Sequence, residues 1–213
     1  MLFVLTGNVQ IGKTRWLNRL VASLSADGVR CAGVLAPGVW RRRSAGEGPS
    51  SSELRLGAAE DRRFEKLGID NILLPQGTRI AFARRADLAR SEGVLDEGSQ
   101  AARAGLGWAI DDDAIAQVNR HFDALRATPP AEASLLVVDE LGRLELMRGE
   151  GLTSALALLN AGPTEAFPHA IVVARDYLLP QARSRFEGSW GAVATIAPDD
   201  AGEQKVRAAL RVR

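Results

Sequence analysis

The chain has 213 residues, of which 46% are hydrophobic and 25% charged, a balance that excludes global disorder and predicts one globular domain over residues 1–213. Its 27 basic and 26 acidic side chains leave a formal net charge of +1, which does not favour a dedicated nucleic-acid binder. The lone cysteine, Cys31, excludes an internal disulfide, and no Cys or His cluster predicts a metal site.

The N-terminal part of the chain predicts a β-α-β unit. Leu2–Thr6 is a short apolar run of the kind that forms a buried parallel strand. Beyond Thr14, apolar residues recur at helical spacing until Asp27-Gly28 ends the pattern, and residues 29–36 are then expected to form a second strand. Because two consecutive strands joined by a helix run in the same direction, this unit predicts a parallel sheet.

Residues 37–107 differ in character and predict a β-rich insertion after the second strand. A Ser-, Gly- and Pro-containing stretch at 44–52 is expected to form its flexible tip, and residues 91–107 a mobile loop. The predicted short strands are Glu53–Leu56, Asn71–Leu74 and Arg79–Ala83, separated by turns at Gly57, Gly68 and Pro75-Gln76-Gly77.

Regular alternation of helices and strands resumes after the insertion. Three aspartates, 111–113, predict the start of a helix whose apolar residues Ile115, Val118, Phe122 and Leu125 share one face. The elements expected after it are strand 135–138, helix 151–160, strand 170–174, strand 192–196 and helix 201–210. Five core strands therefore alternate with helices, which indicates a doubly wound α/β fold with a mostly parallel sheet.

The strongest motif lies between the first strand and the first helix. It matches the phosphate-binding loop pattern GxxxxGK[ST], with Arg15 directly after it, and comprises Gly7, Asn8, Val9, Gln10, Ile11, Gly12, Lys13 and Thr14. Backbone amides of such a loop surround a phosphate at a helix N-terminus. Lys13 is then expected to contact the β- and γ-phosphates and Thr14 to bind Mg²⁺. Nucleoside triphosphates such as ATP and GTP are the predicted ligands of a P-loop NTPase fold.

A second motif ends the strand 135–138 with Asp139 and Glu140. An apolar strand in an open α/β sheet delivers such acids to the edge where ligands bind. We expect Asp139 to hold Mg²⁺ opposite Thr14, and Glu140 to orient or deprotonate an attacking water. A structural alternative is that the two acids only cap the turn that follows.

These two motifs leave three functions open. Glu140 supplies the group that hydrolysis needs, which favours a nucleoside triphosphatase. A phosphotransferase acting on a nucleotide or metabolite would need an acceptor pocket, which the insertion 37–107 could contain. A nucleotide-binding adaptor with little turnover is the third. The Asn-Lys-x-Asp guanine-reading pattern of small GTPases is absent from the sequence, which disfavours a GTPase switch and predicts loose base selectivity.

Two motifs together resemble the small nucleoside-triphosphatase family first described from thermophiles, which includes the human cancer-related nucleoside-triphosphatase. They are Gly7–Thr14 and the segment Asp139-Glu140-Leu141-Gly142-Arg143-Leu144-Glu145-Leu146. The resemblance implies slow, Mg²⁺-dependent hydrolysis of ATP, GTP and also CTP or UTP. Leu141 and Leu144 are conservative departures from the family motif. Gln10 replaces a glycine that family loops often carry.

Two further polar residues lie near the predicted site. Glu145 is expected either to bridge to Arg143 or a loop arginine and hold Glu140 in place, or to be a solvated acid. Arg175 ends a core strand at the ligand edge, where it could stabilise transition-state charge as an arginine finger does. The alternative for Arg175 is a surface position or an ion pair with Asp176.

The remaining candidates have simpler interpretations. Arg41–Arg43 are expected at a solvated hairpin tip rather than on nucleic acid, and His121 and His169 to be structural. Core packing is expected for Trp16, Cys31, Trp40 and Trp108, with stacking on a base as the alternative for the last two. No apolar run approaches the roughly 20 residues that cross a bilayer, and no basic leader precedes Gly7. We therefore expect a cytoplasmic location without membrane contact, and a protein partner remains open.

Overall fold

The computed structural model describes residues 1–8, 11–49 and 63–212. The strands in these ranges are β1 (Leu2–Leu5), β2 (Arg30–Leu35), β3 (Gly38–Arg42), β4 (Phe64–Leu74), β5 (Thr78–Arg85), β6 (Trp108–Ile110), β7 (Ser134–Leu141), β8 (His169–Ala174) and β9 (Val193–Ile196). The α-helices there are α1 (Lys13–Ala26), α3 (Ala86–Ser91), α4 (Gln100–Arg103), α5 (Asp112–Ala127), α6 (Thr153–Asn160), α7 (Leu179–Trp190) and α8 (Asp200–Leu210).

Five of these strands form a parallel core in the order β2-β7-β8-β1-β9. Strand β1 lies inside it, paired with β8 on one side and β9 on the other. The apolar runs that predicted the strands are buried because helices cover both faces of the sheet. The doubly wound, mostly parallel α/β fold predicted from the sequence is confirmed.

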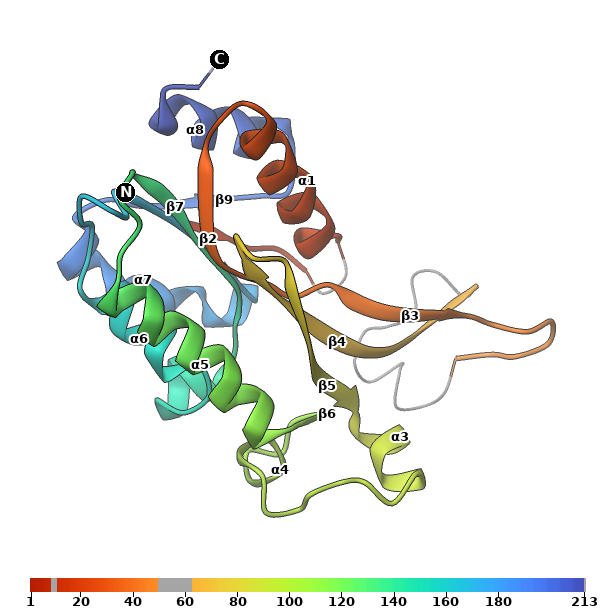
Figure 1. Ribbon diagram of the computed structural model, residues 1–213. Coiled ribbons are helices and arrows are strands. Elements are labelled where there is room, and N and C mark those ends of the chain that lie inside the picture. Colours follow the sequence, from red (N-terminus) through yellow and green to blue (C-terminus); the bar gives the residue numbers. More distant parts are fainter. Residues whose placement is uncertain (9–10, 50–62, 213) are drawn as a thin grey trace.

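The other four strands, β3, β4, β5 and β6, extend the sheet on the β2 side and are called the antiparallel arm here. Strand β4 joins the arm to the core through three residue pairs with β2, from Gly33 with Leu74 to Leu35 with Ile72. Beyond this junction β3 and β4 project away from the rest of the molecule as a long hairpin (Figure 1).

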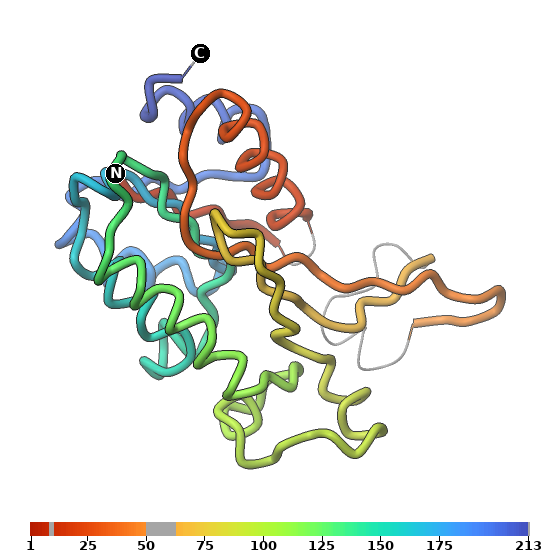
Figure 2. The backbone as a smooth tube through the Cα atoms, in the orientation of Figure 1, coloured from red at the N-terminus to blue at the C-terminus, as the bar shows by residue number. Residues whose placement is uncertain are grey.

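Helices cover the two faces of the sheet unequally. On one face α1 packs through Leu17, Leu20 and Leu24, with Val206 of α8 in the same hydrophobic cluster. On the other face α5, α6 and α7 pack side by side, and Phe122 and Phe186 are fully buried beneath them. The backbone trace shows this three-layer arrangement, with the arm outside it (Figure 2). No helix in the described ranges is long and apolar enough to cross a membrane.

The insertion is where the predicted elements need correction. Gly68 lies inside β4 rather than in a turn, and the predicted strand Asn71–Leu74 is only the end of that long strand. Its β5 partner and the turn at 75–77 are confirmed. Residues 91–107 hold helix α4, which Ser99 caps by accepting from the Ala102 amide, so they are not wholly a loop. The predicted strand 53–56, the turn at Gly57 and part of the tip lie outside the described residues.

Elements without a counterpart in the prediction include β3, α3, β6 and α7. Strand β6 is only three residues long, too short to show an alternating pattern, and it pairs with β5. Helix α7 begins with a proline and has few apolar residues, but it buries Ala182, Phe186 and Trp190 against the core. The Trp190 indole donates to the Leu159 carbonyl at 2.7 Å, which connects α7 to α6.

Candidate functional site

The loop between β1 and α1 has the backbone that its glycines allow. Gly12 is the N-cap of α1 at φ +89°, and Gly7 lies at φ +137°. A side chain on Gly7 would be strained at this φ, whereas its nearest obstacle is the movable end of Ile11, Cδ1, 2.3 Å from a Cβ atom there. Two of the loop positions, Val9 and Gln10, lie outside the described residues.

Lys13 folds back over this loop. Its ammonium group donates to the carbonyl oxygens of Gly7 at 2.6 Å and Asn8 at 2.7 Å. Burial lowers the pKa of Lys13. Since Gly12 offers no side-chain cap, the first amides of α1 lack the partner that an Ser or Asp cap would supply. A lysine and unpaired helix amides at one place form an anion-binding arrangement. Arg15, which directly follows the motif, is exposed.

Asp139 lies beside this loop near the end of β7 and is 1% exposed. Its Oδ1 accepts from the Thr14 hydroxyl at 3.2 Å, and its Oδ2 accepts from the Ala36 amide at 3.0 Å. Burial raises the pKa of Asp139 to about 6, with the Ala36 hydrogen bond acting in the opposite direction. The carboxylate therefore contacts α1 and the chain just after β2.

The donor set of Thr14 and Asp139 fits magnesium. Both supply oxygen atoms, the ligands that Mg²⁺ prefers, and Mg²⁺ in phosphate sites is held by one or two protein groups with phosphates and waters completing its shell. No group of three or more His, Cys, Asp or Glu side chains suited to a metal occurs in the described part of the chain. The arrangement thus suits a metal that arrives with a phosphate ligand rather than a closed structural metal site.

Glu140 and Arg175 form an ion pair next to Asp139. The Arg175 Nε donates to Oε1 of Glu140 at 2.9 Å, and about one third of each side chain is exposed (34% and 35%). Burial acts to lower the pKa of Arg175, but the charge and hydrogen bond of Glu140, together with Tyr177, outweigh it and the pKa is raised. Arg175 therefore lies at the ligand edge as expected, and it pairs with Glu140 rather than with the predicted Asp176.

Glu145 has a different role from either predicted one. It is 6% exposed, and its carboxylate accepts the backbone amides of Gly142 at 2.8 Å and Leu152 at 3.0 Å. It is thus neither a solvated acid nor a partner of Arg143, whose guanidinium donates to the Ala104 carbonyl. Burial raises the pKa of Glu145. Its contacts fasten the turn after β7 to the start of α6.

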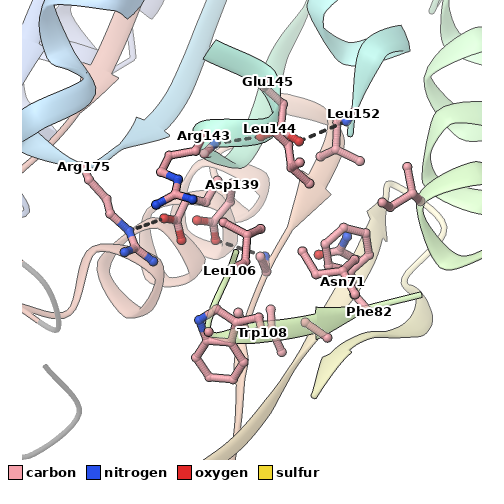
Figure 3. Close-up of a pocket in the computed structure, with 18 of the residues that line it drawn as sticks. Asn71, Phe82, Leu106, Trp108, Asp139, Arg143, Leu144, Glu145, Leu152 and Arg175 are labelled. Atoms are coloured by element: carbon pink, nitrogen blue, oxygen red, sulfur yellow. Dashed lines mark hydrogen bonds and ion pairs between the residues drawn. The ribbon is translucent and has the colours of Figure 1, made fainter. Parts of the chain in front are cut away.

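A cavity of about 270 Å³ opens from these residues toward the antiparallel arm. Thr14, Asp139, Glu140 and Arg175 line one part of it. The other part is lined mainly by apolar side chains of the arm, of α5 and of the turn after β7 (Figure 3). The sequence left open a pocket in the insertion but not its lining, because residues from β4, β5 and the segment before β6 meet β7 only through the arm's antiparallel pairing.

Lys66 of β4 lies in this cavity wall and was also missed. Its ammonium nitrogen is 5.0 Å from the ring centroid of Trp108 and 5.9 Å from that of Trp40, a cation–π arrangement. Burial lowers the pKa of Lys66. Trp40 is 46% exposed, so its predicted core position is wrong, whereas Trp108 lines the cavity. The sequence hint was that two of the four tryptophans flank the insertion.

The other candidate residues have structural partners. Arg41 is paired with Glu65 at 2.5 Å and with Glu47 at 3.3 Å, on a strand rather than at a tip. His121 contacts the Gly33 carbonyl at 3.1 Å, which confirms a structural role. Cys31 and Trp16 are buried as predicted, at 6% and 5% exposure. His169 begins β8 and is half-buried.

Comparison with solved structures finds a protein of the same fold. The crystal structure of THEP1 from the hyperthermophile Aquifex aeolicus matches 99% of this chain and 96% of that chain, with a TM-score of 0.58 and 11% sequence identity. The chain has a P-loop NTPase-like α/β fold. No protein-family model matches the sequence, and a search of curated proteins finds no match. Membership of the small nucleoside-triphosphatase family therefore stays a prediction.

Proposed function

We propose that the protein is a cytoplasmic, Mg²⁺-dependent nucleoside triphosphatase that hydrolyses ATP, GTP and, with loose base selectivity, CTP and UTP. The observation that supports this proposal best is the hydrogen bond between Thr14 of the phosphate-binding loop and the buried Asp139, with Glu140 next along the strand. In this proposal, residues 125 positions apart would supply the phosphate, metal and base positions of one site. Their fold context is the P-loop NTPase-like sheet.

In this proposal the loop 7–14 binds the triphosphate. Lys13 would leave the carbonyls of Gly7 and Asn8 to contact the β- and γ-phosphates. Thr14 and Asp139 would hold Mg²⁺, which when bound neutralises charge on the phosphate oxygens. The negative charge of the bound phosphates and the amides of α1 attract each other, which aligns the triphosphate with the helix.

Glu140 would act as the general base. Its carboxylate accepts a proton from a water whose oxygen attacks the γ-phosphorus, while the bond from that phosphorus to the β,γ-bridging oxygen breaks and the diphosphate leaves with the bonding electrons. Arg175 holds the Glu140 carboxylate through its 2.9 Å hydrogen bond. The same guanidinium lies close enough to the site to offset charge on the γ-phosphate, so we assign it both positioning and charge stabilisation.

The test is phosphate release from ATP, GTP, CTP and UTP with Mg²⁺. We expect Glu140→Gln to lower release by about 10²- to 10⁴-fold because the base is lost. Lys13→Ala should lower it by about 10²- to 10³-fold, as expected for loss of a preorganised charge on the phosphates. Glu132→Gln, at a surface ion pair with Arg30, is the matched control and should leave release unchanged.

Unchanged release in Glu140→Gln would contradict the assignment of the base. Tight nucleotide binding by the wild type without any phosphate release would instead favour the adaptor function. Equilibrium binding of Mg²⁺ with a non-hydrolysable ATP analogue separates these outcomes, because Glu140→Gln should retain that binding and Lys13→Ala should lose it.

A phosphotransferase is the second candidate, and the cavity beside Glu140 favours it. Its apolar part adjoins the carboxylate that would otherwise deprotonate water, so a hydroxyl-bearing molecule could replace that water. The diagnostic result is formation of diphosphate that depends on an added acceptor, with little free phosphate released in its absence. Equal amounts of diphosphate and free phosphate without an acceptor would leave hydrolysis as the reaction.

A further inference from the structure

Asn71 is an unusual residue to find inside the molecule. It lies on β4 opposite Ile80 of β5 and is 1% exposed. Neither its side-chain oxygen nor its side-chain nitrogen has a hydrogen-bond partner among the described residues. A primary amide offers two donors and an acceptor with two lone pairs. Burying these without partners opposes folding, so the position calls for an explanation.

The strand around Asn71 is otherwise apolar on the same face. Ile69 lines the cavity, and Leu73 packs against the hydrophobic core beneath α5 and α6. A leucine, which has the same number and branching of side-chain heavy atoms as asparagine but is bulkier, would continue this face and leave no polar atom buried. Packing therefore gives no reason for an amide at position 71.

The amide belongs to the cavity already described. Asn71 lines it beside Phe82, at the part remote from the phosphate loop (Figure 3). The apolar side chains that enclose this part include Phe82, Leu106, Trp108, Ile110, Leu144 and Leu152. The cavity thus has one charged part, lined by Asp139, Glu140, Arg175 and Lys66, and one largely apolar part that contains the neutral amide of Asn71.

The walls of the cavity are fastened by hydrogen bonds. Arg143 donates to the Ala104 carbonyl, which ties the segment before β6 to the turn after β7. The Gly151 amide donates to Oε1 of Gln100 at 2.9 Å, which ties helix α4 to the start of α6. These walls would therefore be held in place before a ligand binds, whereas the buried Asn71 amide would have to be uncovered by a small movement of its neighbours.

We propose that this cavity is a binding site for a second small molecule, a neutral, flat heterocycle or aromatic carboxamide with a lactam or amide edge that pairs with Asn71. An amide edge presents a donor beside an acceptor, and Asn71 can meet both at once, as asparagine does with the edge of a base. The apolar walls suit a flat ring and exclude a charged group. Only the nearness of this site to a γ-phosphate rests on the proposed nucleotide function; the binding itself does not.

The probes are uracil, hypoxanthine and nicotinamide, with 1,3-dimethyluracil as the matched compound that cannot donate. Binding to the full-length wild type is measured without nucleotide, by saturation-transfer NMR and by titration of tryptophan fluorescence, to which Trp108 contributes. We expect at least one probe to bind. We expect 1,3-dimethyluracil to bind at least tenfold more weakly than uracil.

The decisive variant is Asn71→Leu, with Asn160→Leu at the exposed end of α6 as its matched control. Asn71→Leu should weaken probe binding at least tenfold and raise the melting temperature, because it removes the buried unpaired amide; Asn160→Leu should leave binding unchanged. If Asn71→Leu does not fold, Leu106→Trp serves instead, because it fills the cavity from a half-buried loop position and keeps the amide. It too should abolish binding.

Two results would overturn the proposal. One is that no probe binds the wild type, and the other is that the probes bind Asn71→Leu or Leu106→Trp as well as the wild type. Lys13→Ala separates this test from that of the nucleotide function, since it should lose binding of Mg²⁺ and the ATP analogue yet retain binding of the probe. An absence of nucleotide hydrolysis would therefore not contradict probe binding, and an absence of probe binding would not contradict nucleotide hydrolysis.

Discussion

The parallel core and the antiparallel arm belong to one sheet, but different forces hold them. Strand β1 is buried along its whole length, and β8 has only its first residue partly exposed. In the arm, β3 passes from half-buried to exposed residues, and β5 is exposed or half-buried except at Ile80 and Arg85. Charged side chains of the arm form ion pairs with one another. The core thus presents the phosphate-binding motif from a rigid apolar layer, while the arm supplies a polar scaffold and one side of the cavity.

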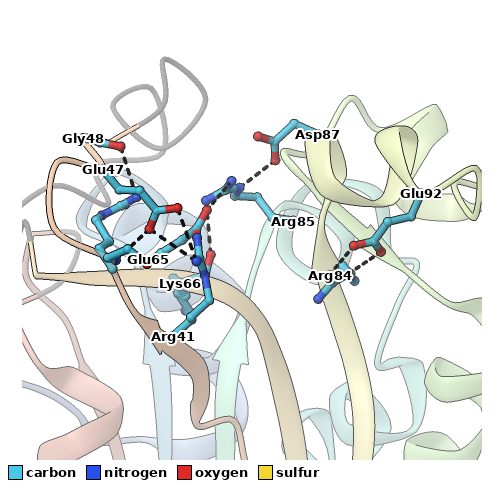
Figure 4. A network of polar contacts seen from close by, with 11 residues as sticks. Arg41, Glu47, Gly48, Glu65, Lys66, Arg84, Arg85, Asp87 and Glu92 are labelled. Atoms are coloured by element: carbon cyan, nitrogen blue, oxygen red, sulfur yellow. Dashed lines mark hydrogen bonds and ion pairs between the residues drawn. The ribbon is translucent and has the colours of Figure 1, made fainter.

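Ion pairs connect charged side chains of the arm to one another (Figure 4). Arg85, 2% exposed, donates to Glu65 at 2.9 Å and to Asp87 at 2.6 Å. Glu65, 6% exposed, also accepts from Arg41. Burial alone would raise the pKa of Glu65, but the hydrogen bonds from Arg41 and Arg85 outweigh it and lower the pKa. We therefore expect substitutions in the core to lower the free energy of unfolding by removing side-chain volume, and substitutions in the arm to lower it by removing a charge.

The largest effect on stability should come from the core. Phe122 of α5 is fully buried against the sheet, so Phe122→Ala leaves a cavity and should lower the free energy of unfolding by about 3–5 kcal/mol. Urea denaturation followed by circular dichroism measures the change. A loss below about 1 kcal/mol would mean that the core can collapse around the missing ring, and would remove the contrast with the arm.

A smaller effect is expected from Arg85→Met in the arm. Among the described residues, the variant leaves the buried Glu65 with Arg41 as its remaining ion-pair partner, and it should lower the free energy of unfolding by about 2–3 kcal/mol at pH 7. Because the pKa of folded Glu65 lies below its ordinary value of 4.5, this contribution is full above about pH 4.5 and is lost as the pH falls through the folded pKa.

The wild type and Arg85→Met should therefore converge in stability under acid conditions, which urea titrations across a pH series would show. Arg90→Met, at an ion pair whose side chains are 65% and 73% exposed, is the control and should leave the unfolding midpoint where it is. Equal loss in both variants would contradict a special role for the buried pair.

The smallest effect should come from the exposed tryptophan of the arm. Trp40→Ser should change the free energy of unfolding by no more than about 0.5 kcal/mol, since the ring is 46% exposed. Its contact with Lys66 at 5.9 Å is longer than that of Trp108 at 5.0 Å. A loss as large as that of Phe122→Ala would show that the hairpin folds as tightly as the core.

The sequence predicted the core far better than the arm, for a physical reason. Strands such as 135–138 are continuous apolar runs because helices cover both faces of a parallel sheet, and the phosphate loop has its own residue pattern. In the arm, one face is solvated and a register shift occurs between Ile69 and Asp70, which breaks the alternation that marks a strand.

The site divides in the same way. Thr14, Asp139 and Glu140 could be placed together because parallel strands end at one edge of the sheet. Glu145 could not, since its partners are backbone amides of Gly142 and Leu152 that depend on a local turn. Asn71 carried a signal in the sequence, a single amide within an apolar stretch, but only its burial beside the cavity gives that signal meaning.

The position of the arm within the chain also affects how the molecule folds. Strand β2 pairs in parallel with β7, with Arg30 opposite Ser134. Along the chain, all of the arm lies between these two strands. Closing so long a loop has an entropic cost, which grows slowly with loop length, and non-local pairing of this kind slows folding. The β4–β5 hairpin, by contrast, joins neighbours through the short turn at 75–77. If this hairpin forms before β2 meets β7, the loop that remains to be closed is shorter, so the placement of the insertion favours this order of assembly.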